Sequence, residues 1–294
     1  MTRSVKTALC LAAAAAVAFG GWTQWAMKRP APREPEGAAV AMLSGRLVVV
    51  GGAAGTQVYD IPHDKWIAGP TLPVPLAHGA FAETARGLEI FGGHDGALVS
   101  RAIWRLEANE RFGWSDGGKA PADTLHGRAA RTGDRTYIFG GCASVTDFNS
   151  CSDKVWMRVR NGAWRQAGAL PHGAVAMMAS AVVGPKVYFF GGVTAAGNRA
   201  DAFEFDAAAN SWRRLADLPR ARRSAAAAAS NGGQVYILGG SADSGPLDEV
   251  LLYDARADRY TPGPPLPRPA GAAAFARRGD MLVGVGGGRT FILR

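Results

Sequence analysis

Short apolar runs that end in a pair of glycines recur along the chain. The runs are LVVVGG, LEIFGG, TYIFGG, VYFFGG, VYILGG and MLVGVGG, and their first glycines are Gly51, Gly92, Gly140, Gly191, Gly239 and Gly286. Successive pairs are separated by 41, 48, 51, 48 and 47 residues. Each run has the length and composition of a buried strand, and this spacing is typical of a four-stranded repeat unit. The pattern predicts six similar four-stranded sheets.

A second pattern of aromatic residues accompanies the glycine pairs. In most repeats an aromatic or large apolar residue follows the glycines, and an indole or phenol comes seven residues later. The pairs are Tyr59 with Trp66, Met157 with Trp164, Phe205 with Trp212, and Tyr253 with Tyr260, while the second repeat is looser, with Trp104 and Trp114. Turn residues separate the two members, so each pair predicts the third and fourth strands of a sheet. The outer ring is expected to cover the edge of its sheet.

The coupled glycine and aromatic pattern resembles the Kelch repeat. This resemblance implies an all-β chain that forms one domain over residues 22–294, a six-bladed β-propeller. The stretch GGAAGTQVYDI, Gly51–Ile61, followed by KWIAGPTLP, is similar to bacterial N-acetylneuraminate epimerases, the sialic acid mutarotases. That resemblance implies an exported protein that acts on an acidic sugar. The chain lacks the long insertions that shape the pocket of that family, so no catalytic residue is carried over by motif.

The last repeat has only three predicted strands, at 272–277, 281–285 and 290–294. The segment WTQWAMKRP, residues 22–30, resembles the strings WRRLADLP and WIAGPTLP, which run from an outer aromatic residue to a proline. We therefore predict that residues 22–29 supply the fourth strand of the sixth blade, with Trp22 beside Phe291. Pairing of the two ends of the chain removes an exposed sheet edge.

The N-terminal segment has the features of a targeting sequence. MTRSVK carries two positive charges, and TALCLAAAAAVAFGG is apolar and uncharged. Residues 1–21 are therefore predicted to be a secretory signal peptide, which places the protein in the periplasm or outside the cell. The alternative is an uncleaved inner-membrane anchor that faces the periplasm, because the uncharged residues 7–27 are long enough to span a bilayer. In an oxidising compartment Cys142 and Cys151 are expected to form a disulfide.

The net charge of +9 is spread along the chain. A nucleic-acid-binding protein requires a basic stripe or a recognisable module, and the sequence has neither. The simplest interpretation is a well-solvated basic surface, which would still attract anionic ligands. The sequence has no HExxH motif, and no His or second Cys pair flanks the cysteines at the spacing of metal ligands. We therefore expect no metal, no cofactor and no nucleic-acid partner.

Polar residues concentrate on two sets of loops that would share one face of the propeller, which we call the mouth face. Histidine can transfer protons near neutrality, and arginine binds carboxylates with two parallel hydrogen bonds. The catalytic candidates are Glu36, His78 and His126, and the ligand-binding candidates are Arg128, His172, Arg222, Arg223, Arg268 and Arg289. The competing interpretation is that these residues form only a solvated polar rim.

We expect a monomer that binds a small acidic carbohydrate in a central pocket. If it is an enzyme, the expected reaction is sugar mutarotation, which needs one base and one acid but no cofactor. The alternative is a non-catalytic module of the cell envelope that binds a protein or polysaccharide, with an acidic peptide as a candidate partner. A purely structural role is the third hypothesis.

Overall fold

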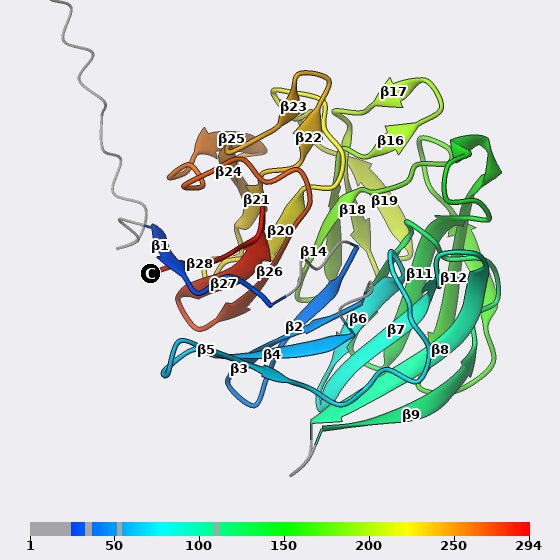
Figure 1. Ribbon diagram of the computed structural model, residues 1–294. Coiled ribbons are helices and arrows are strands. Elements are labelled where there is room, and N and C mark those ends of the chain that lie inside the picture. The colour runs from blue at the N-terminus through cyan, green and yellow to red at the C-terminus, as the bar shows by residue number, and fades with distance from the viewer. Residues whose placement is uncertain (1–24, 33–36, 52–54, 109–111) are drawn as a thin grey trace, which may run out of the picture.

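The computed structural model describes residues 25–32, 37–51, 55–108 and 112–294. Six antiparallel four-stranded sheets, the blades, surround a central axis (Figure 1). The predicted all-β, six-bladed propeller is therefore confirmed. The predicted leader, residues 1–21, lies outside the described residues. Among the described residues, no helix is long and apolar enough to cross a membrane.

The first three blades follow the chain from inside to outside. Blade 1 contains β2 (Ala39–Leu43), β3 (Arg46–Val50), β4 (Thr56–Asp60) and β5 (Lys65–Ala68). Blade 2 contains β6 (Ala80–Thr84), β7 (Gly87–His94), β8 (Val99–Ala108) and β9 (Phe112–Lys119). Blade 3 contains β10 (Arg128–Thr132), β11 (Arg135–Cys142), β12 (Cys151–Val159) and β13 (Arg165–Ala169), with the 3-10 turn η2 (Phe148–Ser150) between β11 and β12.

Blades 4 and 5 each carry an additional short hairpin on the mouth face. Blade 4 contains β14 (Ala179–Val183), β15 (Lys186–Phe190), β18 (Ala202–Asp206) and β19 (Ser211–Arg214), with the hairpin β16 (Val193–Thr194) and β17 (Gly197–Asn198). Blade 5 contains β20 (Ala226–Ala229), β21 (Val235–Leu238), β24 (Val250–Asp254) and β25 (Arg259–Pro262), with the hairpin β22 (Ser241–Ala242) and β23 (Gly245–Pro246). Blade 6 contains β26 (Ala273–Arg278), β27 (Met281–Gly286) and β28 (Arg289–Leu293).

The N-terminal strand β1 (Trp25–Lys28) completes blade 6 by pairing antiparallel with β28. This confirms that the two ends of the chain meet in one sheet. Trp22, which was predicted to lie beside Phe291, falls outside the described residues. Instead the ring of Trp25 contacts that of Phe291, with centroids 6.2 Å apart. The carbonyl of Arg29 accepts hydrogen bonds from Trp66 of blade 1 at 3.2 Å and from Thr290 of blade 6 at 2.5 Å.

The aromatic pairs seen in the sequence are neighbours on adjacent strands. Tyr59 lies opposite Trp66 in the ladder of β4 and β5, and their ring centroids are 5.1 Å apart. Phe205 and Trp212 are 4.9 Å apart in blade 4, in a core cluster that also contains Phe139 of blade 3. The rings therefore fill the space between neighbouring blades, where aromatic side chains contribute much of the buried apolar area.

The glycine pairs let neighbouring loops approach the second strand of each blade. Gly191 has φ +60°, and a Cβ atom there would lie 2.4 Å from the carbonyl oxygen of Arg222. Gly141 has φ +120°, and a Cβ atom there would lie 2.4 Å from the carbonyl oxygen of Asp123. Only glycine combines a left-handed backbone with this close approach. The repeated pair thus fixes the loops that form the mouth face.

Candidate functional site

The innermost strands β2, β6, β10, β14, β20 and β26 each have a sheet partner on only one side. Their free edges face the axis of the propeller (Figure 1) and enclose a channel with a volume of about 560 Å³. The walls contributed by β20 and β26 consist mostly of alanines, including Ala226–Ala229, Ala273 and Ala274. Because methyl groups occupy little space, this side of the channel remains open.

A series of backbone hydrogen bonds links the loops that enter blades 1 to 5 at the mouth of the channel. In each case the backbone N–H of one loop donates to a carbonyl of the preceding blade's loop. The pairs are His78 to Gly37 at 2.9 Å, His126 to His78 at 2.8 Å, Met177 to His126 at 2.9 Å and Ser224 to Met177 at 2.9 Å. Each donor lies two residues before the inner strand of its blade, and all four have left-handed backbones with φ of 54° to 59°. Successive blades therefore present equivalent side chains at one level of the channel. Two of these side chains, those of His78 and His126, are imidazoles.

The structure brings His78 and His126 together at this mouth. Their ring centroids are 4.8 Å apart, and the ring of His94 stacks on that of His78 with centroids 5.5 Å apart. Nε2 of His126 lies 3.4 Å from the carbonyl oxygen of Val145. Because a carbonyl only accepts, a neutral His126 carries its proton on Nε2, which leaves Nδ1 as the basic nitrogen.

Burial, together with the neighbouring His78, lowers the pKa of His126 from 6.5 to about 4. Only 3% of His126 is exposed, so loss of hydration is the main cause. The imidazole is therefore neutral at pH 7. It can exchange hydrogen bonds with a bound molecule but carries no charge.

This pKa predicts a specific pH dependence of stability. Between pH 6.5 and 4 the unfolded chain binds a proton at His126 that the folded protein does not, so stability is full above this range and falls as the pH drops. At about 1.4 kcal/mol per pH unit, His126 accounts for a loss of about 3 kcal/mol. Urea unfolding at several pH values should show this loss in the wild type and a shallower loss in His126→Gln. The exposed His63 provides a control, and an equal loss in His126→Gln and His63→Gln would contradict the assignment.

Arg128 is the first residue of β10 and lines the channel just inside the mouth. Its Nη1 donates to the carbonyl of Gly127 at 2.9 Å. Among the described residues no carboxylate forms an ion pair with it. Burial lowers the pKa of Arg128 to about 10, so the guanidinium remains charged at pH 7. The channel therefore contains a cation whose remaining N–H groups are free to bind an anion.

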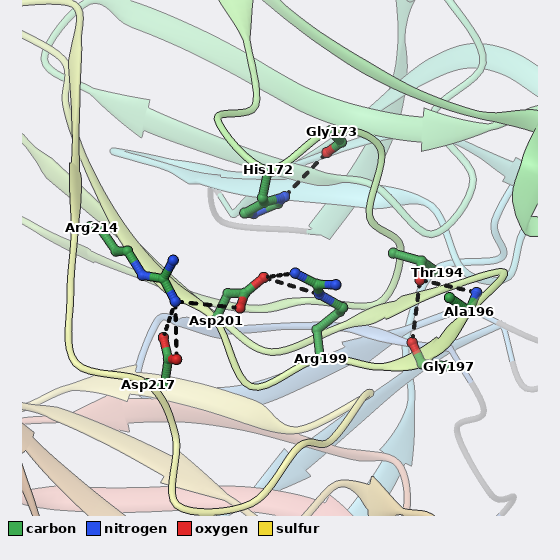
Figure 2. Close-up of polar contacts among 9 residues, drawn as sticks. All are labelled: His172, Gly173, Thr194, Ala196, Gly197, Arg199, Asp201, Arg214 and Asp217. Carbon is green, nitrogen blue, oxygen red and sulfur yellow. Dashed lines mark hydrogen bonds and ion pairs between the residues drawn. The ribbon is translucent and has the colours of Figure 1, made fainter.

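The remaining candidates from the sequence lie elsewhere. Glu36 falls outside the described residues. His172 does not line the channel: its ring packs 4.6 Å from Phe203, and Nδ1 lies 3.1 Å from the carbonyl oxygen of Gly173. Figure 2 shows His172 beside an ion-pair chain in which Asp201 contacts both Arg199 and Arg214. Burial lowers the pKa of His172. Its contacts place this histidine in a loop framework outside the channel.

The structure corrects the expectation for Arg222. Its side chain is completely buried and pairs with Glu249. It also donates to the carbonyls of Gly239 and Arg220, each at 3.3 Å. These contacts tie the loop that enters blade 5 to that blade, so Arg222 has a structural role and cannot reach a ligand.

Arg223, Arg268 and Arg289 lie on the mouth face but do not line the channel. Arg223 donates from Nη1 to Asn198 at 3.0 Å, and Asn198 in turn donates to Asp243 at 2.7 Å. Arg268 and Arg289 are exposed. These three residues form an outer rim around the channel, and their predicted role in ligand binding remains a prediction.

Cys142 and Cys151 form a disulfide, as the sequence predicted. They face each other at the ends of β11 and β12, and the loop between them carries Val145 and Phe148. The ring of Phe148 lies 6.3 Å from that of His126. The disulfide thus closes the loop that covers one side of His126.

Sequence reasoning missed the walls of the channel. The string SAAAAAS, residues 224–230, was a usable signal, because an inner strand made only of alanine leaves space at the axis. Glu83 and Arg131, deeper in the channel, were also missed. Among the described residues, no group of three or more His, Cys, Asp or Glu side chains is arranged to hold a metal ion.

This fold is similar to that of a known protein family and of a solved structure. The family profile for the KLHDC2/KLHL20/DRC7 Kelch-repeats domain matches residues 125–293. The solved structure titled "Structure of YjhT" superposes with a TM-score of 0.76 at 16% sequence identity, covering 90% of this chain and 95% of that one. At this identity the likeness concerns the fold alone. A search of curated proteins gave no match. The family match, over more than half of the chain, shows that the protein belongs to the Kelch-repeat family.

Proposed function

We propose that the protein binds a small acidic carbohydrate in its central channel. The observation that carries this proposal is Arg128, a charged guanidinium in a cavity of about 560 Å³ with no ion-pair partner among the described residues. Arg128 is half-buried, so its guanidinium has lost part of its hydration without gaining a counter-ion, and a ligand carboxylate would compensate for this loss through paired hydrogen bonds.

The walls of the channel suit the rest of such a ligand. Six inner strands turn an unpaired edge to the axis, and such an edge carries backbone N–H and C=O groups that can bind hydroxyls. The adjacent alanine methyls offer apolar surface to the C–H groups of a sugar ring. Ligand sites commonly combine an apolar wall with a few fixed polar groups in this way.

Calorimetry with matched sugars tests the proposal. Glucuronate and N-acetylneuraminate should bind, while glucose, which lacks the carboxylate, should bind at least tenfold more weakly, a difference of about 1.4 kcal/mol. Arg128→Gln should abolish the preference for the acid. Arg160→Gln is the matched control, because Arg160 is exposed and follows β12 at the end away from the mouth. Equal binding of glucuronate to wild type and Arg128→Gln would overturn the proposal.

Catalysis of mutarotation is a further step of the same proposal. The paired imidazoles of His78 and His126, 4.8 Å apart beside Arg128, support it. Because the low pKa of His126 makes it a weak base, His78 is the better candidate for removing the anomeric proton. NMR of freshly dissolved N-acetylneuraminate would reveal the activity as faster anomer equilibration. An unchanged rate together with intact binding would leave a binding protein that is not an enzyme.

A second candidate function is the binding of an acidic peptide across the mouth face. The exposed rim arginines Arg268 and Arg289 favour it, because exposed guanidinium groups pair with carboxylates. We also propose that the protein works in an oxidising compartment outside the cytoplasm. The disulfide between Cys142 and Cys151 supports this location.

A further inference from the structure

We propose that the far end of the channel forms a second recognition site, in which Glu83 binds an amino group of the ligand. The ligand would then be an ampholyte, with a carboxylate at Arg128 and an amine deeper in the channel. This inference rests on the proposed function, because it assumes that an acidic ligand occupies the channel. It narrows the ligand class to acidic sugars with a free amine, and to other amino acids of matching length.

Strand registers place the two groups at different depths. Arg128 pairs with Phe139 and Ala80 pairs with Phe91, and each phenylalanine immediately precedes a glycine pair. Ala80 in β6 is therefore the counterpart of Arg128 in β10. Glu83 lies three residues further from the mouth, which is roughly 10 Å along a strand. Both side chains line the same channel.

Glu83 has no cationic partner among the described residues. It accepts a hydrogen bond from the backbone N–H of Met42, and the surrounding protein raises its pKa by burial. The residue is nevertheless exposed, and because it lines the channel, the open space of the channel reaches its carboxylate. An ammonium group of a ligand would stabilise this carboxylate.

Two arginines share the far end of the channel without neutralising Glu83. Arg277 is held by backbone carbonyls: its Nε donates to Gly279 at 2.6 Å and its Nη1 to Ala229 at 3.0 Å. Arg131 stands at the same level as Glu83 on the neighbouring strand, but the two form no ion pair. The charge of Arg131 instead acts on Arg158, whose pKa it helps to lower. The carboxylate of Glu83 therefore remains available to a cationic group of a ligand.

A series of linear amino acids measures the depth of this site. The probes are γ-aminobutyrate, ε-aminocaproate and ω-aminocaprylate, each compared with the carboxylate of the same length that lacks the amine. In the wild type the amine should strengthen binding at least fivefold for one of the two longer chains and have no effect for γ-aminobutyrate, which is too short to bridge the two side chains. The isosteric Glu83→Gln should reduce the gain to less than twofold.

Arg131→Gln is the matched control, because it removes a charge at the same level. Loss of Arg131 should leave the affinity gained from the amine unchanged or increase it, because the positive charge of Arg131 repels the ammonium group of the ligand. The proposal is overturned if the amine gives no gain at any length, or if the gain survives in Glu83→Gln. In both cases the Arg128-dependent binding of glucuronate stands as a separate result. Loss of glucuronate binding in the wild type would instead refute the proposed function itself.

Discussion

Replacement of Trp25 by alanine is expected to lower the free energy of unfolding by about 3 kcal/mol. Trp25 lies on the strand that closes the propeller. The centroid of its indole ring lies 5.6 Å from that of Phe275 and 6.2 Å from that of Phe291. Its Nε1 donates to the carbonyl of Pro264 at 2.8 Å. Removal of a large packed ring typically costs 3–5 kcal/mol, and Trp25 is only partly buried, so the lower end of that range is expected.

Met27 on the same strand provides the control. Its side chain is 58% exposed, so Met27→Ala should change stability by no more than about 0.5 kcal/mol. Denaturant unfolding of the two variants measures the difference. If Trp25→Ala were as stable as Met27→Ala, the N-terminal strand would not close the propeller, and blade 6 would stand as a three-stranded sheet.

Arg222 should be as important for folding as Trp25. Arg222→Met removes a fully buried guanidinium and leaves Glu249 and two carbonyls without their donor. Removal of one partner from a buried ion pair is strongly destabilising, because the other charge loses its compensation. Since Glu249 remains partly exposed, we expect a loss of about 3 kcal/mol, at the lower end of the usual range.

The adjacent Arg223 is the matched control for this substitution. Among the described residues, its half-buried side chain donates one hydrogen bond, to Asn198. Arg223→Met should therefore leave the free energy of unfolding within about 0.5 kcal/mol of the wild type. Thermal unfolding of both variants is the measurement. Equal midpoints for the two variants would show that Arg222 does not hold the loop that enters blade 5.

The fold could be predicted from the sequence because its signal is repeated. A single glycine pair has many explanations, but six pairs coupled to aromatic partners have few, since each repeat must bury its face against the next. The closing strand was recognisable because WTQWAMKRP resembles the outer strands of other repeats. Its pairing with β28 follows from the need to cover the last edge.

The site was harder to predict, because the orientation of a side chain in a loop depends on tertiary partners. Arg222 and Arg223 are adjacent, yet one points inward to Glu249 and the other outward to Asn198. Nothing local in the sequence distinguishes them. His78 and His126 were correctly placed at the mouth because they occupy equivalent positions in consecutive repeats. Glu83 was missed because a single carboxylate near the end of a strand does not reveal that the edge of this strand faces a channel.

A ligand-bound crystal structure tests the central claim most directly, because the claim concerns where an acidic ligand sits. Crystals soaked with glucuronate should show the sugar inside the channel, with its carboxylate hydrogen-bonded to the guanidinium of Arg128. Density for the sugar at Arg223, Arg268 or Arg289, with an empty channel, would contradict the account and assign ligand binding to the outer rim.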